Sequence, residues 1–197
     1  MLTCTGSGRL AKMLRLVEYA HQKVAEVVCP GDFCIDATAG NGHDTVFLAR
    51  MVSPGGKVYA FDIQEEAIRA TQSRLTESGL EDIAVLISEC HSMVRQSIPS
   101  HLSGQIAAAT FNLGYLPGRD HTVCTRPTET VKAIRGCYEL LRADGCLSIL
   151  CYRGHEGGSE EAQAVEKCLR EANWLVEKTT GGTAGHSPIH FLVRKRI

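Results

Sequence analysis

The sequence has no long hydrophobic run, no C-x-x-C pair and no excess of charge of either sign. No apolar stretch approaches the roughly 20 residues that cross a bilayer, which excludes a spanning helix. The formal net charge is −1, so a strongly basic coat is absent and any nucleic-acid binding must use a local patch. Repeats and long linkers are also absent, and the 197 residues predict one soluble globular domain, 1–197.

The nine cysteines are odd in number and show no metal-ligand spacing. Cys34, Cys146 and Cys151 lie inside apolar runs. This pattern predicts small buried thiols in a reducing compartment, with neither a disulfide framework nor a metal site. Such a compartment is the cytoplasm, or an organelle of bacterial descent such as a chloroplast or mitochondrion.

The N-terminal segment 1–17 has basic residues and no acid, which is typical of an organellar transit sequence. Apolar residues also recur in it at helical spacing, namely Leu10, Met13, Leu14 and Val17. We favour the second interpretation, the buried face of a first helix, and expect residues 1–9 to be flexible or processed.

Short apolar runs alternate with helical patterns along the rest of the chain. The predicted strands are 33–38, 57–62, 83–87, 106–111, 146–152, 174–179 and 189–195, and the predicted helices are 44–51, 65–77, 128–142 and 159–172. This alternation predicts an α/β fold with a mostly parallel sheet and helices on both faces. Only the loop "TGGTAGHSP" separates the last two strands, so they form an antiparallel hairpin. This order of elements predicts the Rossmann-like class I methyltransferase fold with seven strands.

The loop "DATAGNGHDT" joins the first strand to the next helix. Gly40 and Gly42 allow a tight turn and close approach to a ligand. Asp36 and Asp44 would repel a pyrophosphate but attract a sulfonium and an ammonium, and Asp62 ends the second strand where a ribose would lie. These features favour S-adenosyl-L-methionine over a dinucleotide; the alternative is a tight turn with an incidental acid. The predicted cofactor site is Asp36, Thr38, Ala39, Gly40, Asn41, Gly42, Asp44, Asp62, Ile63, Gln64, Cys90, His91, Asn112 and Leu113.

Two features of that site remain open. After the third strand, "SECHSM" places Cys90 and His91 near the expected adenine, but Ser88 or Glu89 could instead cap a helix. After the fourth strand, "NLGYLPG" is either a plain turn or the place where Asn112 and Tyr115 meet a substrate.

The "NLGYLPG" stretch is comparable to the Asn/Asp-Pro-Pro-Tyr/Phe tetrapeptide of amine-directed methyltransferases, with Leu113 and Gly114 in place of the prolines. It therefore predicts a nitrogen nucleophile, which must be neutral to attack. Asn112 can accept a hydrogen bond but is not a strong base, so the proton acceptor stays open. The predicted catalytic residues are Asn112, Tyr115, His121 and Tyr152.

Two polar segments follow at the same edge of the sheet, "GRDHTVCTRPTET" and "YRGHEGGSEE". One interpretation makes them ordinary loops and helix starts. The other makes them a substrate lip in which arginines contact phosphates and histidines stack on bases. The predicted substrate residues are Tyr115, Arg119, His121, Arg126, Arg153 and His155.

Three stretches together, "DATAGNGHDTVFLA", "NLGYLPGRDHTVCTRPTET" and "YRGHEGGSEEAQAV", resemble the bacterial YtqB/MnmM family over nearly the whole chain. That family carries the older label of an rRNA methylase family. Its characterised members methylate the amine of 5-aminomethyl-2-thiouridine at the tRNA wobble position. The cysteines and N-terminal residues, together with His186, Ser187 and Pro188 in the tail, depart from bacterial members and indicate a eukaryotic, plant-like relative.

The resemblance implies roles for individual residues. Around S-adenosylmethionine it places Asn41, Asp44, Asp62, Gln64 and His91. Asn112 and Leu113 would lie near the transferable methyl, and Tyr115, His121, Arg126, Tyr152 and His155 would border the anticodon base. The implied partner is the tRNA anticodon loop, and a homodimer is possible. The alternatives are methylation of rRNA or of a small-molecule amine, and a non-catalytic RNA-binding relative.

Overall fold

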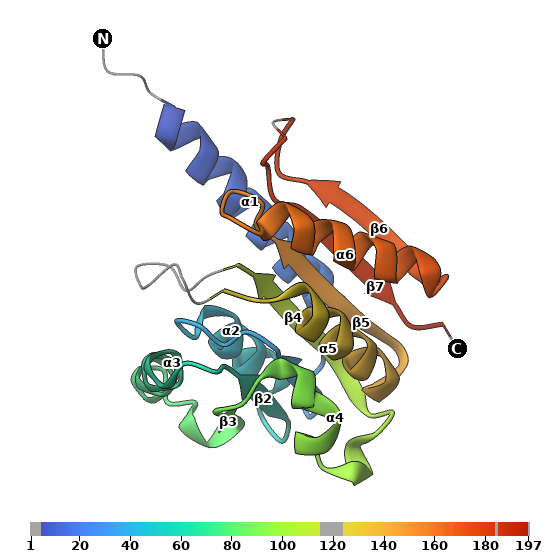
Figure 1. The fold of residues 1–197 in the computed structure, drawn as a ribbon. Coiled ribbons are helices and arrows are strands. Elements are labelled where there is room, and N and C mark those ends of the chain that lie inside the picture. The colour runs from blue at the N-terminus through green and yellow to red at the C-terminus, as the bar shows by residue number, and fades with distance from the viewer. Residues whose placement is uncertain (1–4, 115–123, 184, 197) are drawn as a thin grey trace.

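A computed structural model describes residues 5–114, 124–183 and 185–196, with side chains from residue 15 onward. One seven-stranded sheet lies between two layers of helices (Figure 1). The strands are β1 Phe33–Asp36, β2 Lys57–Phe61, β3 Ala84–Ile87, β4 Ile106–Leu113, β5 Leu141–Cys151, β6 Leu175–Thr180 and β7 Ile189–Arg194. The helices are α1 Thr5–Ala25, α2 His43–Val52, α3 Glu65–Glu77, α4 Val94–Ser97, α5 Pro127–Leu140 and α6 Gly158–Glu171, with short 3₁₀ turns at 81–83, 91–93 and 100–102.

The strand order is β3-β2-β1-β4-β5-β7-β6. The first five strands pair in parallel, whereas β7 pairs antiparallel with both β5 and β6. The predicted closing hairpin and the predicted fold class are therefore confirmed. One boundary differs clearly: β5 begins at Leu141 rather than at residue 146, and Arg142 within it forms an ion pair with Asp32.

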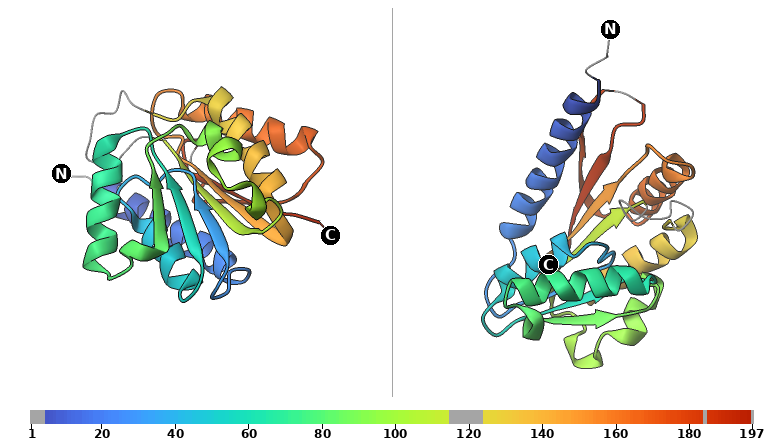
Figure 2. Two further views of the ribbon diagram at one scale, coloured as in Figure 1. Left: turned by 90° about the horizontal axis from the view of Figure 1, so that it is seen from below. Right: turned by 90° about the vertical axis from the view of Figure 1, so that its left-hand side faces the viewer.

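Each face of the sheet is covered by its own layer of helices (Figure 2), and each has its own apolar core. Helices α1, α2 and α3 cover one face, where Val24, Leu48 and Leu75 are fully buried. Helices α4, α5 and α6 cover the other, where Ile134 and Val165 are fully buried. Burial of aliphatic side chains on both faces is what a parallel sheet requires.

Helix α1 confirms the first helix, although its side chains before residue 15 lie outside the description. In the described part the buried residues are Leu16, Ala20 and Val24, while Val17 is half-buried. Leu10, Met13 and Leu14 are thus untested as its buried face. Residues 5–9, predicted as flexible or processed, are helical in their backbone; processing stays a prediction. None of the described helices is long and apolar enough to cross a membrane.

Eight of the nine cysteines are described, and all eight are free. Five of them are buried: Cys34, Cys137, Cys146, Cys151 and Cys168. Burial raises the pKa of the Cys146 thiol to about 12, so this group stays protonated at neutral pH. The predicted buried thiols are confirmed, whereas the reducing compartment stays a prediction.

Candidate active site

The candidate site lies where the chain reverses the direction in which it adds strands to the sheet. Strands β1 and β4 are neighbours although two strands separate them in sequence. Ligands of open α/β sheets bind outside the carboxyl ends of strands at such a point. Here the glycine loop leaves β1 at Asp36, and β4 ends at Leu113.

The glycine loop is held tightly against α3. Gly40 and Gly42 both have positive φ, 54° and 79°. A Cβ on Gly42 would lie 2.8 Å from the Thr71 Cα, so no other residue fits without moving the helix. The Arg74 Nε donates to the Asn41 carbonyl at 2.6 Å and further fixes the loop. This rigid loop presents the start of α2 toward the site.

Asp36 is fully buried beneath the loop. Its two carboxylate oxygens accept from the Thr45 hydroxyl at 2.6 Å and the Thr38 backbone N–H at 3.2 Å. Burial, and to a smaller extent the nearby Asp44 carboxylate, raises the pKa of Asp36 to about 7. Both carboxylate oxygens are thus hydrogen-bonded within the protein, and direct contact of Asp36 with a cofactor stays a prediction.

Asp62 links the glycine loop to the turn before α3. Its Oδ2 accepts from the Gly40 N–H at 2.9 Å, and its Oδ1 accepts from the Gln64 N–H at 3.0 Å. A carboxylate oxygen has a second lone pair, so both can also accept from ribose hydroxyls. Beside it, the Ile63 side chain is 56% exposed, which is unusual for a large apolar group.

His91 closes this part of the site on the far side. Its Nδ1 lies 3.1 Å from the Ala37 carbonyl, and its buried Nε2 has no partner among the described residues. Burial lowers the pKa of His91, which keeps the ring neutral. Half-buried Cys90 directly precedes the 3₁₀ turn, and no side chain caps that turn. The Glu89 carboxylate instead accepts from the Ser97 hydroxyl. The alternative in which Ser88 or Glu89 caps a helix is therefore not observed.

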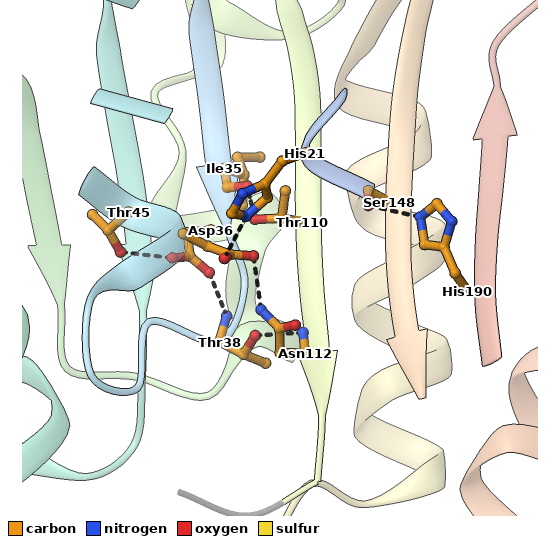
Figure 3. A network of polar contacts seen from close by, with 10 residues as sticks. His21, Ile35, Asp36, Thr38, Thr45, Thr110, Asn112, Ser148 and His190 are labelled. Atoms are coloured by element: carbon orange, nitrogen blue, oxygen red, sulfur yellow. Dashed lines mark hydrogen bonds and ion pairs between the residues drawn. The ribbon is translucent and has the colours of Figure 1, made fainter. Parts of the chain in front are cut away.

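Asn112 joins the two halves of the site (Figure 3). Its backbone N–H donates to the Thr38 hydroxyl at 2.7 Å, and its Nδ2 donates to Asp44 Oδ2 at 2.8 Å. The other oxygen of Asp44 lies 2.9 Å from Nε2 of His21 on α1. Sequence reasoning missed His21, because a single histidine on a helix carries no signal of its place in the fold.

Two described residues of the predicted substrate lip contact the end of β4. The Tyr152 N–H donates to the Leu113 carbonyl at 3.1 Å, and the His155 ring lies next to Gly114. Burial, with a smaller effect of Asp44, raises the pKa of Tyr152 to about 12. The Tyr152 hydroxyl therefore stays protonated at neutral pH and does not act as a base. The Arg153 Nε donates to the Ser187 carbonyl at 2.7 Å.

Glu161 and Thr125 hold together the two ends of the segment 115–123. The Thr125 hydroxyl accepts from the Gly114 N–H at 3.0 Å and donates to Glu161 at 2.5 Å, while Thr130 donates to Glu161 at 2.6 Å. Thr125 thus binds the strand end, and Arg126, which is exposed, precedes α5 with Pro127 at its start. Tyr115, Arg119 and His121 lie outside the described residues.

The charges of this edge fit a cationic cofactor. Asp36, Asp44 and Asp62 gather around one glycine loop, and the pKa of Asp36 is raised by both of the others in addition to burial. A sulfonium and an ammonium relieve this repulsion, whereas a pyrophosphate adds to it. Ile63 offers an uncovered apolar surface and His91 a buried ring nitrogen beside Asp62. Among the described residues no His, Cys, Asp or Glu cluster could hold a metal ion.

The strand order, the closing hairpin and the acidic glycine loop define a class I S-adenosylmethionine-dependent methyltransferase, and S-adenosylmethionine is the cofactor of this class. The family model described as "Putative rRNA methylase" matches residues 58–181, and the chain belongs to this family. The model of the "ubiE/COQ5 methyltransferase family" matches residues 14–100. The suspected family resemblance is thereby confirmed.

Solved structures agree over nearly the whole chain. A "putative rRNA-methylase" from Clostridium thermocellum is 36% identical with a TM-score of 0.85, covering 91% of this chain and 96% of that one. A "putative methyltransferase" from Streptococcus mutans, solved in complex with S-adenosylhomocysteine (SAH), is 33% identical with a TM-score of 0.80, covering 91% and 97%.

A curated relative adds a more specific name. The "tRNA (mnm(5)s(2)U34)-methyltransferase, chloroplastic" of Arabidopsis thaliana is 36% identical over 167 residues, which is 81% of this chain. The match spans 60% of the length of that relative.

Proposed function

We propose that the protein is a tRNA methyltransferase that N-methylates the 5-aminomethyl group of (2-thio)uridine at the wobble position, giving 5-methylaminomethyl-(2-thio)uridine. The observation that carries the proposal is the Asn112 side chain at the end of β4. Its Nδ2 is occupied by Asp44, which leaves Oδ1 as the acceptor for an amine. The name of the Arabidopsis relative supports the substrate.

Three groups of residues would bind the ribose, the adenine and the methionine part of the cofactor. Asp62 accepts from the ribose hydroxyls, since its backbone partners have already fixed its oxygens. Ile63 and His91 border the adenine, and Asp44 faces the charged methionine part. When bound, S-adenosylmethionine supplies an electrophilic methyl group on a sulfonium.

Asn112 would then align the substrate amine. An aliphatic amine is mostly protonated near neutral pH and must lose a proton before it attacks. Asn112 Oδ1 accepts from the neutral amine and fixes its direction, which lowers the entropy cost of alignment. Tyr152 remains protonated and donates, so it does not remove the proton.

The lip would bind the anticodon loop. Arg119, Arg126 and Arg153 are proposed to contact phosphates, while Tyr115, His121 and His155 border the flipped base. Because the net charge is only −1, this local group has to supply most of the salt-dependent affinity. The chloroplast relative favours an organelle of bacterial descent as the location; the homodimer stays a prediction.

The test is methyl transfer to tRNA carrying 5-aminomethyl-2-thiouridine, followed by nucleoside mass spectrometry. The modified nucleoside should gain 5-methylaminomethyl-2-thiouridine only with enzyme and S-adenosylmethionine. The matched substrate control is the same tRNA bearing unmodified uridine. Unchanged nucleoside, with SAH binding shown by calorimetry, would contradict the proposal. Absence of SAH binding would instead favour the non-catalytic relative.

The family description favours a second candidate, methylation of rRNA. Total rRNA in the same assay, quantified per mole of acceptor, separates the two. Transfer to the free aminomethyl nucleoside as efficient as to intact tRNA would instead indicate a small-molecule amine substrate.

A further inference from the structure

His21 reaches the candidate site from outside every sequence motif described above. It lies on α1, whose buried residues Leu16, Ala20 and Val24 fix the helix against the sheet. Its ring stacks on Phe47 of α2 with centroids 4.0 Å apart and planes 6° from parallel. Its Nε2 lies 2.9 Å from Asp44 Oδ1. Stacking on Phe47 and the hydrogen bond to Asp44 therefore fix the position and the orientation of the ring.

Asp44 divides its two oxygens between two elements. Oδ1 meets His21 from α1, and Oδ2 accepts the Asn112 Nδ2 at 2.8 Å from β4. Among the described residues Asp44 Oδ1 has His21 as its one hydrogen-bond partner, so without His21 the carboxylate could rotate. The chain His21–Asp44–Asn112 thus joins α1, α2 and β4, and Figure 3 labels its two ends, His21 and Asn112. In the proposed function, the substrate amine lies beside Asn112.

The direction of the Asn112 amide follows from this chain. An ionised carboxylate only accepts hydrogen bonds, so the amide group that faces it must be the NH₂ end. The carbonyl Oδ1 is then directed away from Asp44. If Asp44 rotated away, the amide could flip and offer donors to an amine that itself needs an acceptor.

We propose that His21 is a positioning residue, which holds Asp44 so that Asp44 fixes the Asn112 amide with its oxygen toward the substrate amine. This inference rests on the proposed function for its catalytic consequence. The hydrogen-bond chain itself can be tested without any substrate.

Three substitutions separate packing from hydrogen bonding. His21→Phe keeps a ring to stack on Phe47 but removes the donor. His21→Gln keeps a donor at about the same reach, because its Nε2 is as far along the side chain as that of histidine. His21→Asn is equally polar but too short. His101→Phe, at an exposed histidine, is the matched control.

The first readout is the side-chain amide signal of Asn112 in ¹H–¹⁵N spectra of the SAH-bound protein, assigned by its loss in Asn112→Ala. We expect this signal to move from its wild-type position in His21→Phe and His21→Asn. In His21→Gln and in the control His101→Phe it should stay close to the wild-type position. An unchanged Asn112 signal in both His21→Phe and His21→Asn would overturn the proposal.

The second readout is kinetic. Turnover on aminomethyl-thiouridine tRNA should fall about tenfold or more in His21→Phe and His21→Asn, the usual effect of losing a hydrogen bond to a charged group. KM for tRNA and the Kd for SAH should change less than about twofold, and His21→Gln should recover most of the turnover. Equal losses in kcat, KM and SAH affinity would reduce His21 to a structural residue. A wild-type protein inactive on tRNA would refute the proposed function alone, and the Asn112 signal would still decide the role of His21.

Discussion

Asp62 accepts a hydrogen bond from the Gly40 backbone N–H at 2.9 Å, across 22 residues of sequence. The contact joins the end of β2 to the glycine loop after β1. The same carboxylate also accepts from the Gln64 N–H. The acid predicted to bind ribose therefore has a second role, since it also fixes the glycine loop that we propose surrounds the cofactor.

Asp62→Ala should weaken SAH binding by about 1–3 kcal/mol, because a charged hydrogen-bond acceptor and the loop contact are lost together. Isothermal titration calorimetry measures this loss. The control is Glu65→Gln, which changes an exposed acid three residues away. Equal SAH affinity in Asp62→Ala and wild type would remove Asp62 from the cofactor site.

Asn112→Ala should leave SAH affinity within about twofold and lower turnover by at least about tenfold. The reason is that Asn112 acts on the amine, while Thr38 and the glycine loop keep their own contacts. Single-turnover transfer measures the turnover and calorimetry measures the SAH affinity. The control is Gln96→Ala, at an exposed position on α4. A parallel loss of affinity and turnover would show that Asn112 is structural.

Glu161→Ala should destabilise the protein by about 2 kcal/mol, because the hydroxyls of buried Thr130 and half-buried Thr125 lose their acceptor. It should also raise KM for tRNA, since Thr125 and Gly114 hold the ends of the 115–123 segment. Urea unfolding and steady-state kinetics measure these effects. Glu161→Gln retains one acceptor and can donate to the other hydroxyl, so its effect should be smaller. The exposed neighbour Glu160→Ala should change neither quantity.

His190 should make the protein sensitive to acid. Burial lowers the pKa of His190 to about 4, and its Nε2 lies 2.9 Å from the buried Ser148 hydroxyl. The unfolded chain binds a proton near pH 6.5, so the stability present above that pH is lost as the pH falls toward 4.

Between pH 7.5 and pH 5 this single group should lower the free energy of unfolding by about 2 kcal/mol. Urea unfolding at the two pH values tests it, with His190→Gln showing a smaller difference and exposed His101→Gln a wild-type one. A wild-type slope in His190→Gln would assign the acid sensitivity to other groups.

The strands and main helices were predictable because their apolar periodicity is set by burial on both faces of the sheet. Helix α3 was predicted at the observed bounds, and in the structure Ala67, Thr71 and Leu75 are its buried residues. The start of β5 was missed because the charged residues Arg142 and Asp144 interrupt the apolar pattern. Arg142 instead binds Asp32 and the Val27 carbonyl, both distant in sequence.

The candidate site was predictable only where a local motif marked it. The glycine loop, Asp62 and Asn112 stand at strand ends, where sequence position alone implies a place in the site. His21 and Glu161 act through partners 23 and 31–36 residues away, so their roles follow from the folded chain alone. The burial of Asp36 was likewise hidden, because its partners Thr45 and Thr38 look like ordinary loop residues.

The three carboxylates around the glycine loop also bear on how a reaction cycle ends. Transfer of the methyl group converts a sulfonium into a neutral thioether, so the product keeps only its ammonium and relieves less of the repulsion among Asp36, Asp44 and Asp62. The electrostatic attraction that favours entry of the methyl donor is thus weakened by the reaction itself. Because Asp36 gains its charge near pH 7, the binding preference for donor over spent product should widen as the pH rises. The loop would then favour product release and limit product inhibition.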